Sequence, residues 1–310
     1  MAARESDESR ERLEDAEARL FAALEIEPEV TWIEVPHLST TVRVVDAGRG
    51  EPTLCIHGSP NAAATWAQLA AAMPGRRFLM LERPGSGLSG PVTWENHRRQ
   101  TVDLMTHVLD HLDIRSVDVV GSSFGGLYTY YLAIDAPQRV RSMVQMGASA
   151  AGPGVSFPFV FRMMCLPGAV TFMRAGFKPT VAGAQAGWRQ IGHSKALEAD
   201  TIPVELFEWY AALVGHGAVL TGTVDEVRAI STPFGYKPGV VPTAKELAGL
   251  RCPTLYVWGE HDAFAGPEVG RSLAAFTPDA QFEMLPDGGH LPWCDNPERV
   301  ATWLIDFFAR

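Results

Sequence analysis

The chain has 310 residues, of which 46% are hydrophobic and 20% are charged, and its net charge is −10. This composition provides the core of one large folded domain, which excludes intrinsic disorder and a small disulfide-held scaffold. The acidic balance, with no dense block of Lys or Arg, argues against nucleic acid and anionic lipid as partners.

The cysteines, the N-terminal segment and the most apolar segment indicate the cellular compartment of the protein. The four cysteines lie far apart without a CxxC pair, which predicts reduced thiols: Cys55, Cys165, Cys252 and Cys294. Residues 1–20 carry many charges and no apolar centre, so they do not read as a secretory signal. Residues 157–173 are apolar but too short and too interrupted to span a membrane. We therefore expect a cytoplasmic protein with no membrane span.

The N-terminal segment, residues 1–30, is predicted to be a helical extension. Apolar side chains recur on one helical face over 7–25, at Leu13, Ala16, Leu20 and Leu24. We expect this face to dock on the body of the same chain, and a homodimer contact is the alternative.

Strand and helix patterns then alternate along the chain. The predicted strands cover 31–36, 41–48, 53–58, 78–82, 116–122, 140–148, 253–260 and 280–285. The predicted helices cover 93–113, 124–135, 267–276 and 297–309. This order predicts an α/β fold with a mostly parallel central sheet flanked by helices.

The alternation stops between residues 151 and 245, which are rich in Gly, Pro and aromatic residues and lack clear strands. We interpret 151–245 as an inserted helical cap. The sheet-forming core is then divided into a first part, residues 31–150, and a second part, residues 246–310.

A Gly-x-Ser-x-Gly motif provides the strongest functional signal. It centres on Ser123, between a predicted strand and a predicted helix, where a sharp turn raises the hydroxyl above the sheet. Such a nucleophile elbow needs small neighbours, and the helix N-terminus favours developing negative charge. A glycine-rich turn without chemistry is the alternative interpretation.

A serine hydroxyl needs a base and a carboxylate, and both follow in the expected order. Asp262 lies in the loop after one late strand, and His290 lies in the loop after the next. Both loops leave the carboxyl ends of strands, the edge at which open α/β sheets bind ligands. Glu260 and Asp287 are rival carboxylates, and Asp262 is preferred because it lies beyond the strand end.

A tetrahedral intermediate also needs hydrogen-bond donors for its oxyanion. We assign these to the backbone N–H groups of Phe124, directly after the nucleophile, and of Ser59, in the loop after the third strand. His57 is expected to brace this loop rather than take part in catalysis.

Five segments resemble the α/β-hydrolase fold superfamily with a cap domain, from about residue 31 to the C-terminus. They are HGSP at 57–60, ERPGSGLS at 82–89, GSSFGG at 121–126, WGEHD at 258–262 and GGHLPW at 288–293. The first is similar to the HGxP loop of epoxide hydrolases and haloalkane dehalogenases, which use an aspartate nucleophile. Ser123 in that place favours a serine hydrolase.

Two patterns suggest cofactors or metals and are set aside. Residues 85–90 match GxGxxG, but Pro91 follows directly and no helix begins there. His107 and His111 have the spacing of metal ligands but lie off the apolar helix face, without an HExxH context. We expect neither a metal nor an organic cofactor.

The sequence thus predicts a serine esterase that cleaves a small or medium, mostly apolar carboxylic ester through an acyl-enzyme. The same triad serves C–C bond hydrolases, aminopeptidase-type amidases and acyltransferases, and the fold also serves as a non-enzymatic binding scaffold. Met and aromatic residues crowd the cap, where few Lys or Arg occur, so a neutral small molecule is the expected substrate. Trp66, Phe161 and Trp293 are the candidate substrate-binding residues.

Overall fold

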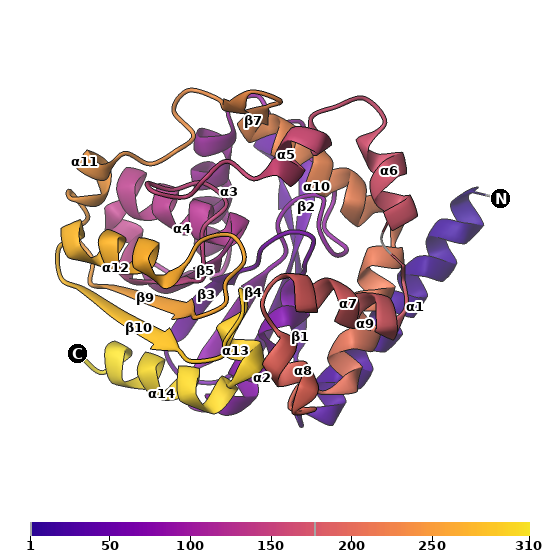
Figure 1. Cartoon of the computed structure of the whole chain (residues 1–310), viewed down its shortest axis with the longest axis horizontal. Coiled ribbons are helices and arrows are strands. Elements are labelled where there is room, and N and C mark those ends of the chain that lie inside the picture. Colours follow the sequence, from indigo (N-terminus) through magenta and orange to yellow (C-terminus); the bar gives the residue numbers. More distant parts are fainter. Residues whose placement is uncertain (1, 177) are drawn as a thin grey trace.

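A computed structural model describes residues 2–176 and 178–310, and it contains an eight-stranded sheet (Figure 1). The strands lie in the order β1-β2-β4-β3-β5-β6-β9-β10. Their bounds are β1 Glu29–Val35, β2 Thr40–Gly48, β3 Pro52–Ile56, β4 Arg77–Leu81, β5 Val117–Ser122, β6 Val140–Met146, β9 Thr254–Gly259 and β10 Ala280–Leu285. β2 runs antiparallel to both neighbours, and the other pairs are parallel, so the predicted mostly parallel sheet is confirmed.

Helices cover both faces of this sheet (Figure 1). One core cluster joins the sheet to α3 (His97–His111), α4 (Phe124–Asp135) and α12 (Pro267–Phe276). The other joins it to α1 (Ala2–Ala23), α2 (Ala67–Ala72), α13 (Pro292–Asp295) and α14 (Pro297–Phe308). Because both faces are covered, every residue of the strands β5 and β9 is buried.

The segment between β6 and β9 is largely helical, as its composition predicts. It contains α5 (Phe159–Met164), α6 (Ala169–Gly176), α7 (Val181–Gln190), α8 (Ser194–Glu198), α9 (Val204–Gly215), α10 (Gly217–Ile230) and α11 (Ala244–Leu247). A two-stranded hairpin, β7 (Ser231–Thr232) and β8 (Gly235–Tyr236), was not predicted, because four residues carry no usable periodicity. The helices α5–α10 lie over the sheet edge, and we refer to residues 151–245 as the cap (Figure 1).

The N-terminal helix α1 packs on the body of the same chain. Its Leu13, Ala16 and Leu20 are buried as predicted, and the helix lies against α9 of the cap. Glu17 also forms a buried ion pair with Arg43 of β2. No helix within the described residues is both long enough and apolar enough to cross a membrane.

Candidate active site

Ser123 occupies the sharp turn between β5 and α4. Its φ of 54° and ψ of −116° lie where few non-glycine residues are found, which is the strain expected of a nucleophile elbow. A side chain at Gly125 would overlap the Ile56 carbonyl of β3, so only glycine lets α4 approach the sheet this closely. The turn therefore presents Ser123 at the N-terminus of a buried helix, whose dipole favours negative charge.

Asp262 and His290 come together at the same sheet edge. The Nδ1 atom of His290 lies 2.9 Å from Oδ2 of Asp262, and both side chains are almost fully buried. The backbone N–H of Ala148 donates to Asp262 Oδ2, and that of Phe264 donates to Oδ1, each at 2.9 Å. These contacts hold the carboxylate in one orientation toward the imidazole.

The electrostatics of this pair define the chemistry that His290 can perform. Burial alone would raise the pKa of Asp262, but the charge and hydrogen bond of His290 and the two backbone N–H groups outweigh it, so the pKa lies below its usual value. An ionised carboxylate only accepts hydrogen bonds, so His290 Nδ1 carries a proton, and in the neutral form of the imidazole Nε2 has a free lone pair. His290 and Ser123 line the same cavity, so a base and a hydroxyl face one space, as nucleophilic catalysis requires.

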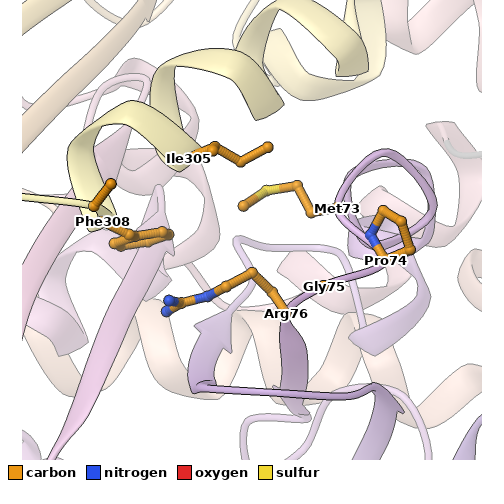
Figure 2. A pocket seen from close by; sticks show the side chains of 7 residues that line it. Met73, Pro74, Gly75, Arg76, Ile305 and Phe308 are labelled. Atoms are coloured by element: carbon orange, nitrogen blue, oxygen red, sulfur yellow. The ribbon is translucent and has the colours of Figure 1, made fainter.

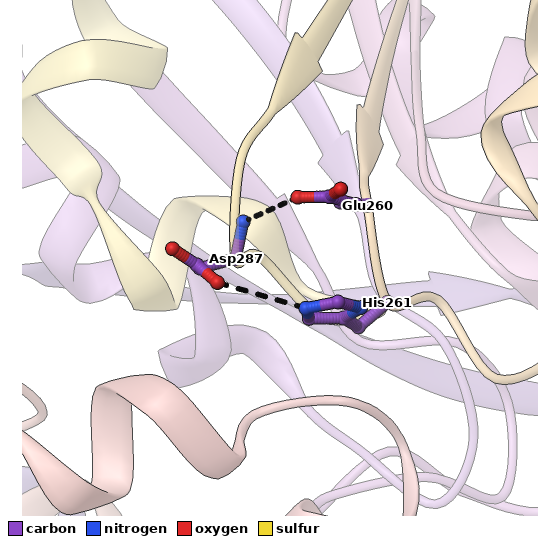
Figure 3. Close-up of side chains that lie close together, drawn as sticks. All are labelled: Glu260, His261 and Asp287. Atoms are coloured by element: carbon purple, nitrogen blue, oxygen red, sulfur yellow. Dashed lines mark hydrogen bonds and ion pairs between the residues drawn. The ribbon is translucent and has the colours of Figure 1, made fainter.

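The two rival carboxylates, Glu260 and Asp287, have partners other than His290. Glu260 accepts a hydrogen bond from the backbone N–H of Asp287 at 3.0 Å, and Asp287 forms an ion pair with His261 at 3.7 Å (Figure 3). All three side chains are exposed. The structure therefore pairs His290 with Asp262, and the catalytic role of this pair stays a prediction.

The loop after β3 lies directly beside the elbow. A Cβ added at Gly58 would lie 2.8 Å from the Cβ of Ser123, so this loop passes as close as a backbone without a side chain allows. Ser59 and Phe124, the residues whose N–H groups we assign to the oxyanion hole, both line the cavity with Ser123.

A buried arginine and His57 hold this loop in place. Arg83 donates to the carbonyl oxygens of His57 and Gly58 at 2.9 and 2.8 Å and to the hydroxyl of Ser59. His57 itself bonds Gly58 O through Nδ1 and accepts from the Arg83 N–H through Nε2. Burial and the Arg83 charge lower the pKa of His57 to about 3, so it is neutral and braces the loop, as expected.

A cavity of about 650 Å³ opens above Ser123, between the sheet edge and the cap. Its cap side is mostly apolar and is lined by Phe161, Met164, Phe172, Met173, Trp188 and Tyr210. Among its lining residues, Lys178 is the one Lys or Arg. The Thr223 hydroxyl is buried at the wall without a hydrogen-bond partner in the described chain, a feature that no sequence pattern indicated. The cavity fits a small molecule with an apolar part.

Of the three predicted substrate-binding residues, Phe161 lines this cavity and two do not. Trp66 and Trp293 are fully buried and stack on each other with ring centroids 4.2 Å apart. The Trp293 indole donates to the Thr65 carbonyl at 2.8 Å. Their assignment to substrate binding was wrong, because both are packed in the hydrophobic core.

A second cavity of about 340 Å³ lies between α14 and the turn before β4 (Figure 2). None of Ser123, Asp262 and His290 lines it. Its one cation, Arg76, already pairs with Asp118 at 2.5 Å and lies 4.2 Å from the Phe308 ring centroid. This surface has no catalytic group, so the cavity under the cap is the candidate active site.

Comparisons with known proteins agree with the fold. The chain belongs to the α/β hydrolase fold family, whose sequence profile matches residues 51–297. It is 30% identical to a 2-hydroxymuconate semialdehyde hydrolase of Pseudomonas sp. strain CF600, over 85% of this chain and 89% of that protein. It is 27% identical to a 2-hydroxy-6-oxononadienedioate/2-hydroxy-6-oxononatrienedioate hydrolase of Cupriavidus pinatubonensis, with the same coverage.

Solved structures share the fold at lower identity. Carboxylesterase CesB from Bacillus subtilis has a TM-score of 0.73 at 22% identity and covers 97% of this chain and 98% of its own. A variant of the meta-cleavage product hydrolase CumD from Pseudomonas fluorescens IP01 has a TM-score of 0.69 at 20% identity, covering 92% and 98%. At such identities the resemblance establishes the fold and not the substrate.

Proposed function

We propose that the protein hydrolyses a C–C bond beside a carbonyl group, with Ser123, His290 and Asp262 as its catalytic triad. The observation that carries this proposal is the similarity in sequence, along most of the chain, to hydrolases of 2-hydroxymuconate semialdehyde and of related dienedioates. The carboxylesterase CesB from B. subtilis shares the fold at 22% identity, which does not establish the predicted ester specificity. C–C hydrolysis, the alternative in the sequence-based prediction, therefore becomes the main hypothesis.

In the first half of the proposed reaction, Ser123 attacks the carbonyl carbon of the substrate. His290 Nε2 takes the hydroxyl proton, and Asp262 stabilises the resulting imidazolium. The N–H groups of Ser59 and Phe124 stabilise the oxyanion, with Arg83 holding the Ser59 loop.

Collapse of this intermediate breaks the C–C bond. The electron pair of that bond leaves with the carbon fragment, so the fragment must be stabilised as an enolate by a second carbonyl group. His290 returns its proton to this fragment, and the acyl group stays on Ser123. A water deprotonated by His290 then releases the acid and restores the serine.

The residues that line the cavity also restrict the chemical character of the substrate. Its apolar cap side fits a hydrocarbon or aromatic part, whereas Lys178 is the lining cation that can pair with a substrate carboxylate. The Thr223 hydroxyl, which has no hydrogen-bond partner among the described residues, belongs to a residue of the cavity wall. We propose a substrate with one apolar end and a conjugated oxygen-bearing end.

The experiment compares kcat/KM for 2-hydroxymuconate semialdehyde with kcat/KM for p-nitrophenyl butyrate on the same preparation. We expect turnover of the C–C substrate to exceed ester turnover, and Ser123→Ala to abolish both. If the ester is turned over efficiently and 2-hydroxymuconate semialdehyde is not consumed, the proposal is wrong and the esterase predicted from the sequence is the better assignment.

A further inference from the structure

The loop that carries His290 is held by three consecutive backbone N–H groups, and the cap provides two of the three acceptors. The N–H of Gly289 donates to Asp295 Oδ2 at 2.8 Å, and that of His290 donates to the Ile191 carbonyl at 2.9 Å. The N–H of Leu291 donates to Nε2 of His193 at 3.3 Å. The backbone on both sides of His290 is therefore bonded to residues other than its catalytic partners.

His193 and Asp295 form a second buried Asp–His pair beside the first. His193 Nδ1 lies 2.7 Å from Asp295 Oδ1, and both side chains are almost fully buried. Because Leu291 donates to Nε2, the proton of the neutral imidazole must be on Nδ1, facing the carboxylate. Asp295 thus fixes the tautomer of His193 and at the same time holds Gly289.

The cap backbone touches this loop at two glycines. Gly192 has a φ of +101°, and a side chain there would overlap the His261 carbonyl. A Cβ at Gly289 would lie 2.8 Å from two ring atoms of His193. Glycine at both positions lets the cap approach the His290 loop within backbone contact.

His193 also connects this contact to the cavity wall. Its ring lies 5.0 Å from that of Trp188, centroid to centroid, and Trp188 lines the cavity. The same cap segment thus touches the substrate space on one side and the His290 loop on the other.

We propose that His193 and Asp295 are positioning residues that fix the backbone of His290, so that its imidazole stays aligned between Asp262 and Ser123. The cap then controls the catalytic base directly, in addition to enclosing the substrate. This inference rests on the proposed role of His290 as the base, and it holds whether the bond cleaved is C–C or ester.

The test uses His193→Phe, which keeps a ring against Trp188 but removes both hydrogen bonds, and the nearly isosteric Asp295→Asn. His216→Phe is the matched control, because His216 is a cap histidine that bonds Ser9 and not the His290 loop. For each variant we would measure kcat and KM, the rate of Ser123 labelling by a fluorophosphonate, the pH–activity profile, and Tm.

We expect His193→Phe and Asp295→Asn to lower kcat and the labelling rate about tenfold to a hundredfold, the scale of a small misplacement of a catalytic group. KM should stay within about twofold, because no bond to substrate is lost. The pH–activity profile should change as well, because a loosened imidazole no longer keeps its bond to the Asp262 carboxylate. His193→Gln, which restores an acceptor for Leu291, should recover part of the rate.

A lower Tm with unchanged kcat, labelling rate and pH profile would show that the pair is only structural, and it would overturn the proposal. A folded Asp295→Asn variant with normal labelling would overturn it equally, even if His193→Phe failed to fold. Normal labelling of His290→Ala would instead contradict the proposed function, so the two failures are distinguishable.

Discussion

The buried ion pair between Arg83 and Glu226 offers a quantitative test of how the cap and core depend on each other. Glu226 projects from α10 of the cap, and Arg83 follows β4 in the core, with both side chains at most 2% exposed. Tyr128 donates to the Glu226 carboxylate at 2.7 Å, and His97 Nε2 lies 3.3 Å from it. Replacing Glu226 with Gln keeps the shape but leaves the Arg83 charge buried without a counterion.

The expected loss of stability at pH 7 is about 3–5 kcal/mol, the usual result of removing one partner of a buried pair. Burial would raise the pKa of Glu226, but the Arg83 charge and the His97 hydrogen bond outweigh it and lower the pKa to about 2. A pKa below the ordinary 4.5 means that folding stabilises the ionised carboxylate, which has the same sign as the expected loss. For a chain of this length, Tm should fall by about 5–8 °C.

The lowered pKa of Glu226 also determines in which direction the stability of the protein changes with pH. Because the pKa of Glu226 is lowered by folding, its contribution is complete above about pH 4.5 and is lost as the pH falls toward 2. Calorimetry between pH 7 and pH 3 should therefore show a difference in Tm between wild type and Glu226→Gln. This difference should be constant from pH 7 to about pH 4.5 and become smaller below it. The surface control Glu198→Gln, at an exposed pair with Lys195, should change Tm little. A Glu226→Gln protein as stable as wild type at pH 7 would refute the reasoning.

Three further predictions concern the triad and the cavity. Ser123→Ala should abolish fluorophosphonate labelling while Ser122→Ala retains it, as intact-protein mass spectrometry can show; labelling of Ser123→Ala would mean another nucleophile. Asp262→Asn should lower kcat by about 10⁴, because His290 loses the partner that fixes its tautomer, whereas Glu260→Gln should have little effect in the same assay. Lys178→Met should raise KM for a carboxylate-bearing substrate more than for a neutral one, and equal effects on both would remove Lys178 from substrate binding.

Most of the sheet and the three candidate catalytic residues were predictable from local sequence. Strands such as β5 and β9 are mostly apolar and buried throughout, and Ser123, Asp262 and His290 each follow a strand at its carboxyl end. Parallel strands bring those ends to one edge, so the sequence order alone places the residues together. The short helix α2 was missed, because the alanine-rich run at 62–72 has no apolar periodicity to identify it.

Contacts across long chain separations were not predictable in this way. Trp66 and Trp293 are distant in sequence, and nothing local indicates that they stack on each other rather than face the cavity. The bonds from His193 and Ile191 to the His290 loop likewise depend on where the cap docks. Arg83 and Glu226 looked like ordinary charged residues, and only the docked cap turns them into a buried pair.

The central claim is that one serine, Ser123, carries the hydrolysis of a C–C bond. The most direct measurement is a titration with a fluorophosphonate, in which the fraction of Ser123 labelled is determined by peptide mass spectrometry and the turnover of 2-hydroxymuconate semialdehyde is measured on the same samples. We predict that the C–C activity falls linearly to zero as labelling of Ser123 reaches completion. C–C activity that persists in fully labelled protein would contradict the claim.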